Sequence, residues 1–138
     1  MLFRSIYIIS KGDTSGIALY RFQANARPGT LSTLERVGQP LTSSRVREHD
    51  WITAATLSSD GLWVALRTHK VVMFYRAGEF LRGIWNEVAR AEVGSLDEAK
   101  GEGVALAAGN TLFLTAEGGG GGRPGTFWRL SCPSIDGR

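Results

Sequence analysis

Apolar residues follow the same pattern in two stretches of the chain that lie 49 residues apart. Residues 52–68 (ITAATLSSDGLWVALRT) and residues 101–117 (GEGVALAAGNTLFLTAE) each contain an apolar run, a short break and a second apolar run. The breaks hold Asp-Gly at 60–61 and Gly-Asn at 109–110, pairs that accept the positive φ angles of tight hairpin turns. Each stretch is therefore predicted to form two strands joined by a turn, with Trp63 buried between sheets.

A third copy of the pattern lies near the N-terminus, where residues 7–9 (YII) align with residues 63–65 (WVA) at a spacing of 56. Each of the three central strands is followed by a strand with two aromatic or apolar residues and an arginine. These segments are residues 19–21 (LYR), 74–76 (FYR) and 127–129 (FWR). A repeat of about fifty residues is typical of an all-β repeat protein. The predicted units are approximately residues 1–46, 47–98 and 99–138.

Between these strands the pattern is less regular. Residues 31–37 are predicted to form a strand or an irregular edge, and residues 77–83 (AGEFLRG) one helical turn. Residues 87–93 (EVARAEV) contain alanine and glutamate, which favour a helix, but their register with the first unit predicts an outer strand.

The glycine-rich segment at residues 118–125 (GGGGGRPG) has the same place in its unit as residues 11–16 and residues 69–70 have in theirs. All three are predicted to be hairpin connections. A phosphate-binding loop would need a lysine and a following helix, whereas here Arg123-Pro124 leads into a predicted strand. The segment is therefore interpreted as a long hairpin loop.

The charge pattern does not indicate a strongly charged partner. The net charge is +3, from 16 lysines and arginines against 13 acidic residues, and the arginines are scattered along the chain. Nucleic-acid binding is not expected, because it would need a basic stripe with interleaved aromatic residues. The apolar N-terminal run is interrupted by Arg4 and is too short for a membrane span or a signal segment. No membrane partner is expected, and the compartment stays open, the periplasm and the exterior included.

Few side chains suggest catalysis. Cys132 has no second cysteine and is expected to be a half-buried strand residue. His49 and Asp50 could act as an acid–base pair, but neighbouring residues on a strand point to opposite faces. His69 falls at a predicted hairpin tip and is expected to be exposed. No catalytic residue and no organic cofactor is predicted.

The Ser-x-Asp-Gly turn at residues 58–61, followed by an apolar strand and an aromatic strand, resembles the repeats of bacterial WD-like and phytase-like β-propellers. The likeness is clearest from residue 52 to residue 130. It departs from the family pattern at Ser59, where those repeats usually have proline, and the third unit has no Asp-Gly pair. The resemblance implies an all-β fold of about three four-stranded antiparallel β-propeller blades. Three blades do not close a ring, so we expect a fragment of a longer protein.

The resemblance also suggests one metal ligand. Glu102, in the sequence GEGVAL, is similar to a strand entry that several propeller hydrolases and lactonases present to a metal in their central channel. Glu117 is added on spacing alone, at the far end of the next predicted strand. Calcium would be the expected ion, and it would need further oxygen ligands. Solvated surface carboxylates are the alternative interpretation for both residues.

Three functions follow from these expectations. The first is a non-catalytic scaffold or binding module within a longer protein, with a protein or small-ligand partner at the loop face. The second is part of a metal-dependent phytase-like or esterase-like hydrolase. The third is a half-propeller that forms a homodimer through its exposed blade edges.

Overall fold

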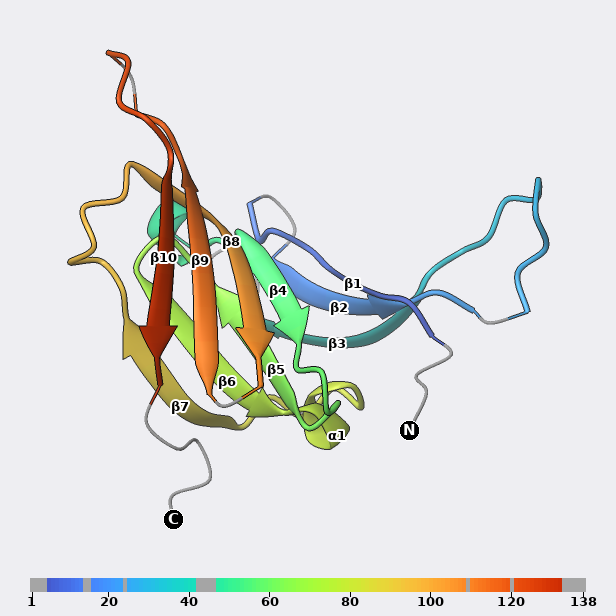
Figure 1. Cartoon of the computed structure of the whole chain (residues 1–138). Coiled ribbons are helices and arrows are strands. Elements are labelled where there is room, and N and C mark those ends of the chain that lie inside the picture. Colours follow the sequence, from blue (N-terminus) through green and yellow to red (C-terminus); the bar gives the residue numbers. More distant parts are fainter. Residues whose placement is uncertain are drawn as a thin grey trace.

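The fold is all-β and consists of three antiparallel sheets (Figure 1). It is described by a computed structural model, which covers residues 5–13, 16–23, 25–41, 47–108, 110–119 and 121–132. Within these residues the sheets do not close into a barrel.

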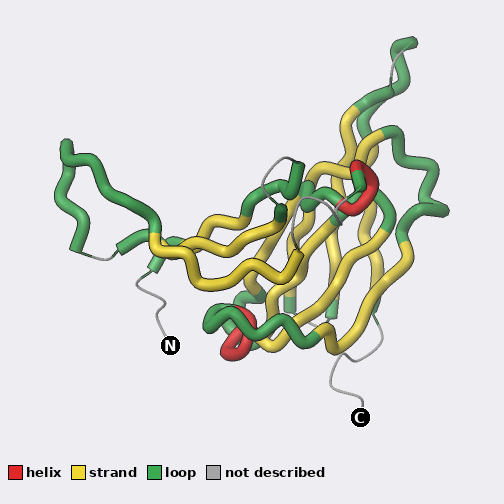
Figure 2. Tube along the Cα trace, turned by 180° about the vertical axis from the view of Figure 1, so that it is seen from behind, coloured by secondary structure: helices red, strands yellow, loops and turns green. Residues whose placement is uncertain are grey.

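The N-terminal sheet has the strand order β1-β2-β3. Its strands are β1 (Tyr7–Ile9), β2 (Ile17–Arg21) and β3 (Glu35–Leu41). The connection between β2 and β3 projects away from the rest of the molecule, as Figures 1 and 2 both show.

The middle sheet has the order β4-β5-β6-β7. Its strands are β4 (Ala54–Leu57), β5 (Trp63–Arg67), β6 (Val71–Arg76) and β7 (Glu87–Glu92). The turn between β4 and β5 is held by its own side chains. The hydroxyl of Ser58 donates to Oδ1 of Asp60 at 2.6 Å, and the Leu62 amide donates to the same oxygen at 2.9 Å. Gly61 has a φ of 72°, as the predicted turn requires.

The C-terminal sheet has the order β10-β9-β8. Its strands are β8 (Lys100–Ala107), β9 (Thr111–Glu117) and β10 (Thr126–Ser131). In the described part of the chain, helix is confined to two short segments, the 3-10 turn η2 (Glu48–Asp50) and α1 (Ala77–Phe80) (Figure 2).

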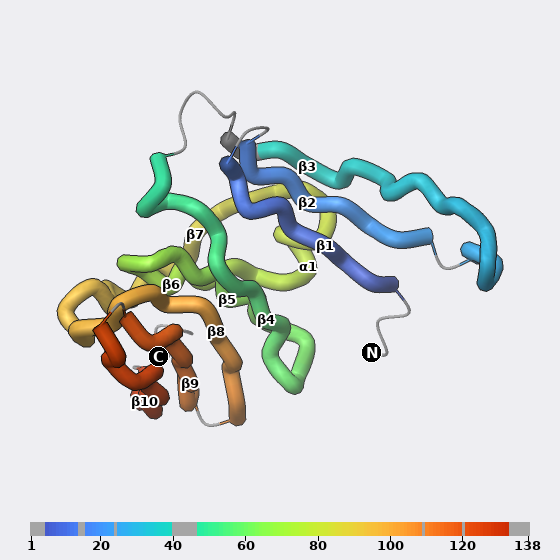
Figure 3. The backbone as a smooth tube through the Cα atoms, turned by 90° about the horizontal axis from the view of Figure 1, so that it is seen from above, coloured from blue at the N-terminus to red at the C-terminus, as the bar shows by residue number. Residues whose placement is uncertain are grey.

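The middle sheet lies between the other two, so its strand β5 is covered on both faces (Figure 3). Val64 and Leu66 of β5 pack toward the N-terminal sheet, in a cluster with Ile17 and Leu19. Trp63 and Ala65 pack toward the C-terminal sheet, in the cluster built on Leu112 and Leu114 of β9. All five residues of β5 are buried in consequence. A strand covered on both faces must be apolar along its whole length, and β5 meets this requirement everywhere except at Arg67.

Most predicted elements are confirmed. Trp63 is buried, residues 77–80 form a helical turn, and residues 87–92 form an outer strand. The glycine-rich segment joins β9 to β10, which pair as an antiparallel hairpin. The strand predicted at residues 31–37 lies instead at residues 35–41. Of the predicted four-stranded units, only the middle one has four strands in the described part of the chain.

The alignment of the third unit was wrong by one residue. Phe74 lies opposite Ala65, and the residue opposite the equivalent Leu114 is Trp128, not Phe127. Because side chains alternate between the two faces of a sheet, this shift reverses their direction. Phe127 is accordingly 67% exposed, whereas Phe74 is 2% exposed.

Candidate functional site

Several connections between the strands gather at one end of the molecule, and we call it the loop end. It carries η2 with the residues that follow it, the β5–β6 turn, the β7–β8 connection and the glycine-rich loop. Backbone contacts hold these segments together. The Ile52 amide donates to the Lys11 carbonyl at 2.9 Å, and the Val93 amide donates to the Lys70 carbonyl at 2.8 Å. Gly119 of the glycine-rich loop lies against Ala99.

An open pocket of about 300 Å³ lies at the loop end. It is lined by Glu48, His49, His69, Ala99 and Lys100. These residues come from η2, from the β5–β6 turn and from the junction of the β7–β8 connection with β8, and four of the five side chains are ionisable. Such a pocket can hold a polar group of a partner, since ligand sites combine concave shape with a few convergent polar groups.

His49 and Asp50 lie closer together than the sequence indicated. They belong to the short helix η2 rather than to a strand, and Nε2 of His49 lies 3.5 Å from Oδ1 of Asp50. Both side chains are about half exposed. The expectation of opposite faces was therefore wrong, because it assumed an extended backbone.

His69 stands at the tip of the β5–β6 turn, as predicted, but it is only partly exposed. The hydroxyl oxygen of Thr68 accepts hydrogen bonds from the amides of Lys70 and Val71, at 3.2 and 3.1 Å, and fixes the turn. Nδ1 of His69 is buried and has no hydrogen-bond partner among the described residues.

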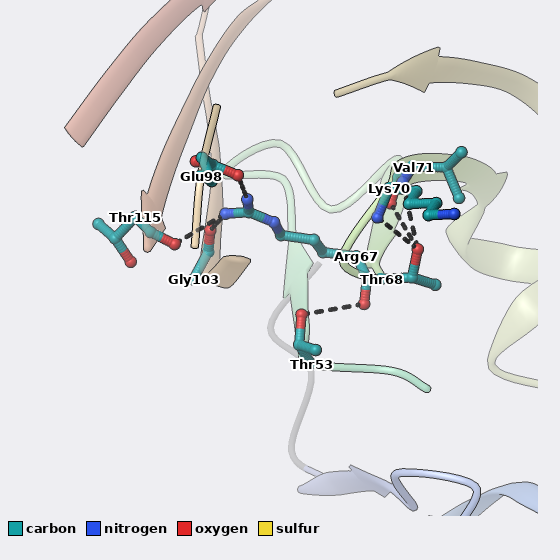
Figure 4. Close-up of polar contacts among 8 residues, drawn as sticks. All are labelled: Thr53, Arg67, Thr68, Lys70, Val71, Glu98, Gly103 and Thr115. Atoms are coloured by element: carbon teal, nitrogen blue, oxygen red, sulfur yellow. Dashed lines mark hydrogen bonds and ion pairs between the residues drawn. The ribbon is translucent and has the colours of Figure 1, made fainter. Parts of the chain in front are cut away.

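Arg67, the last residue of β5, is buried (Figure 4). Its Nη1 donates to the carbonyl oxygens of Gly103 and Thr115, at 2.7 and 2.8 Å, and its Nη2 donates to the carboxylate of Glu98. The side chains of Arg67 and Glu98 are 0% and 3% exposed. Burial lowers the pKa of the guanidinium, and the carboxylates of Glu98 and Glu102 raise it. Arginine keeps its proton under such conditions, so Arg67 and Glu98 form an ion pair. The hydrogen bonds from Arg67 to the carbonyls of β8 and β9 join the middle sheet to the C-terminal sheet.

The space around Arg67 depends on Gly101. A Cβ atom at Gly101 would collide with the guanidinium group. Sequence reasoning missed this arrangement, although a signal was present. Strand alternation puts Arg67 on the same face as Trp63 and Ala65, and a charge on a buried face needs a buried partner.

The two predicted metal ligands lie on neighbouring strands. In β8 a bulge leaves Glu102 without a partner, between the pairs Gly101–Ala116 and Gly103–Thr115. Glu102 is partly buried, with its carboxylate near the Arg67 guanidinium.

Glu117 is exposed at the end of β9, directly opposite Lys100. Each of the two carboxylates therefore has a cation as its neighbour. The described residues contain no group of three histidine, cysteine or acidic side chains that could hold a metal ion. Calcium takes about six to eight oxygen ligands, so these residues do not fit it.

Cys132 is half-buried directly after β10, and its amide donates to the Asn110 carbonyl at 2.8 Å. Burial raises the pKa of its thiol. The nucleophilic thiolate form is therefore disfavoured.

Comparison with known proteins found no matching family model, no matching curated protein and no matching solved structure. In the part of the chain that the structure describes, no helix has the length and apolar character of a membrane span.

Proposed function

We propose that the chain is a non-catalytic scaffold of consecutive β-propeller blades, and that it holds a partner as part of a longer protein. The observation that carries the proposal is the stacking of the three sheets. Strands β4 and β8, which open the second and third units, lie side by side, while β7 lies at the opposite edge of the middle sheet (Figure 1). Consecutive blades of a propeller have this relation, with their first strands gathered around one axis.

The strand pairing supports the same assignment. Trp63 of β5 lies opposite Arg76, and Tyr7 of β1 lies opposite Arg21. The first two units therefore share one register between their second and third strands. In this assignment the N-terminal sheet lacks a described first strand, and the C-terminal sheet lacks a described fourth strand.

A binding role is supported by the contrast between the loop end and the packed strands of the three sheets, which we call the frame. The frame is held by buried contacts, since Arg67 of the middle sheet donates to the carbonyls of Gly103 and Thr115 in the C-terminal sheet. The loop end is open and polar, and its residues come from several connections. A rigid scaffold that presents variable loops is a common arrangement for binding sites. A protein segment or a small ligand at the loop end is the partner that this arrangement supports.

The experiment that tests the proposal is light scattering together with thermal unfolding, each in calcium and in chelator. A scaffold is expected to be a monomer of 14.9 kDa with the same unfolding midpoint in both buffers. A midpoint that calcium raises, and that Glu102→Gln makes independent of calcium, would favour the metal-dependent hydrolase. A calcium-independent dimer of twice 14.9 kDa would favour the self-associating half-propeller.

A further inference from the structure

The space between β1 and β4 has the position of a strand in the repeat. In the second and third units, the first strand pairs with the second, as β4 does with β5 and β8 with β9. Among the described residues, no strand pairs with β1 on the side away from β2. A groove of about 230 Å³ lies there instead.

The walls of this groove are mostly apolar. Tyr7 and Ile9 line it from β1, Leu57 from β4, and Phe80 and Leu81 from α1 and its C-terminal end. The groove is open to solvent, and Leu57 is 37% exposed.

The two faces of β4 differ in burial, and the face toward the groove is the uncovered one. Ala54 and Thr56 lie on the face toward β8, because they pair with Arg67 and Ala65, and both are half-buried. Ala55 and Leu57 lie on the face toward the groove, and both are exposed. One face of the strand is therefore covered by the first strand of the next unit, and the other face is not.

The backbone of β1 is arranged to accept a strand. The Ile6 carbonyl accepts from the Phe22 amide, and the Ser10 amide donates to the Ala18 carbonyl, so these residues turn their backbone groups toward β2. Alternate residues of a strand turn these groups to opposite sides. Tyr7 and Ile9 therefore direct their amides and carbonyls away from β2, toward the open edge of the N-terminal sheet that borders the groove.

We propose that this groove binds an extended peptide segment of a partner protein, which pairs antiparallel with β1 and covers Ala55 and Leu57. The inference rests on the proposed function, because the occupied groove completes the first unit of the scaffold. The chemistry of the segment follows from β4 and β8, the strands that have this place in the other two units. It has small or aliphatic residues at alternate positions, as in ITAATL and VALA, and no proline. Main-chain hydrogen bonds supply affinity in such strand addition, and alternate side chains supply specificity.

The test uses the chain's own strands as probes. Two labelled peptides carry residues 52–58 (ITAATLS) and residues 101–107 (GEGVALA), each flanked by lysines for solubility. Fluorescence anisotropy measures their binding to the full chain. Saturable binding is expected, at least about tenfold tighter than that of scrambled peptides of the same composition. Equal binding of the scrambled peptides would overturn the proposal.

A matched pair of variants locates the binding. Leu57→Glu puts a carboxylate into the groove and is expected to weaken binding about tenfold, because the bound strand would leave that charge buried and unpaired. Val88→Glu is the control, since Val88 is 45% exposed and lies on β7 at the opposite edge of the sheet. It is expected to leave binding unchanged. Equal effects of the two variants would contradict the assignment.

Hydrogen exchange supplies a second measurement that does not depend on a variant. Bound peptide is expected to slow exchange of the Tyr7 and Ile9 amides and to leave the Ile8 amide unchanged, because only the first two face the groove. Unchanged exchange at Tyr7 and Ile9 would overturn the proposal. A dimer of the chain alone, dissociated by Leu57→Glu, would show that a second copy fills the groove and would equally overturn it.

Failure of this inference can be separated from failure of the proposed function. If the chain is a calcium-independent monomer that binds neither peptide, the proposed peptide-binding groove is wrong and the proposed scaffold function is retained. If the chain binds the peptides and calcium also stabilises it through Glu102, the non-catalytic scaffold function is wrong and the peptide-binding groove is retained.

Discussion

Strands β1 and β5 have the same place in the proposed repeat but very different surroundings. Each begins with an aromatic residue that lies opposite an arginine of the next strand. Tyr7 of β1 lies opposite Arg21 of β2, and Trp63 of β5 lies opposite Arg76 of β6. Yet β5 is buried along its whole length, whereas in and beside β1, Ile8 and Ile6 are 44% and 63% exposed.

The difference separates two levels of organisation. Hairpin pairing is set locally, by turn residues and short connections, and so it recurs in each unit. Burial is set by the neighbouring sheet, and β5 has a sheet on both of its faces. Stability should therefore be concentrated in β5 and its contacts, and the following predictions test this distribution.

The largest effect is expected at Arg67. Arg67→Met removes the guanidinium and leaves the Glu98 carboxylate buried without a counter-charge. The free energy of unfolding should fall by about 3–5 kcal/mol, as measured by urea denaturation. Arg129→Met, at an exposed position on β10, should change it by less than about 0.5 kcal/mol. The double variant Arg67→Met/Glu98→Leu should recover part of the loss, because no unpaired charge remains. A double variant no more stable than the single one would argue against the ion pair as the cause.

The aromatic residues at equivalent positions of β5 and β1 give the direct comparison. Trp63 is 6% exposed and packs beneath the Arg76 guanidinium, which lies 4.0 Å from the ring centre. Trp63→Ala should cost about 3–5 kcal/mol by chemical denaturation, as a large-to-small change in a core. Tyr7→Ala should cost about 1 kcal/mol, because Tyr7 is only half-buried. If Trp63→Ala costs less than about 1 kcal/mol, the contrast between the two strands is wrong.

A smaller effect concerns Tyr75 of β6, whose neighbours include Phe80 and Trp85. Burial, with a contribution from Glu87, raises the pKa of Tyr75 to about 12, while Arg90 lowers it. Its unfolded pKa is about 10, so the contribution of the neutral phenol is complete below that pH and is lost as the pH rises toward 12.

Between pH values of about 9 and 11, the free energy of unfolding should therefore fall by about 1 kcal/mol through this group. Denaturation at the two pH values measures the fall. Tyr75→Phe should remove it, whereas Tyr20→Phe, which leaves Tyr75 in place, should retain it. If the free energy of unfolding falls by the same amount in Tyr75→Phe, other titrating groups cause the fall.

The sequence was sufficient for features that depend on local chemistry. The Asp-Gly turn at residues 60–61, the helical turn at residues 77–80 and the glycine-rich hairpin were all predicted from short stretches. Each depends on backbone preferences of a few residues, which act whatever the rest of the chain does.

Features that depend on distant partners were missed. Arg67 and Glu98 are 31 residues apart, and no local pattern joins them. The register of β10 was also misjudged, because Phe127 and Trp128 are both aromatic and either could face the core. Only the pairing with Leu114 decides between them. His49 and Asp50 were misplaced because a short 3-10 turn leaves little trace in hydrophobic periodicity.

The smallest effect is expected in the glycine-rich loop, which lies beyond the buried frame. Its interior differs from its ends. Gly121 and Gly122 have φ angles of 83° and 81° and open space around them. A Cβ at Gly118 would collide with the Arg123 carbonyl, and one at Gly125 would lie 2.8 Å from the Ala116 carbonyl oxygen.

Deleting Gly121 and Gly122 should change the free energy of unfolding by less than about 1 kcal/mol, because loop closure depends weakly on length. Gly118→Ala should cost more than this deletion, since the obstructing atom belongs to the backbone and the hairpin must shift to admit a methyl group. Denaturation of the two variants side by side measures the difference. If the deletion costs more than Gly118→Ala, contacts within the interior of the loop must stabilise the fold. Stability would then not be concentrated in the covered sheets.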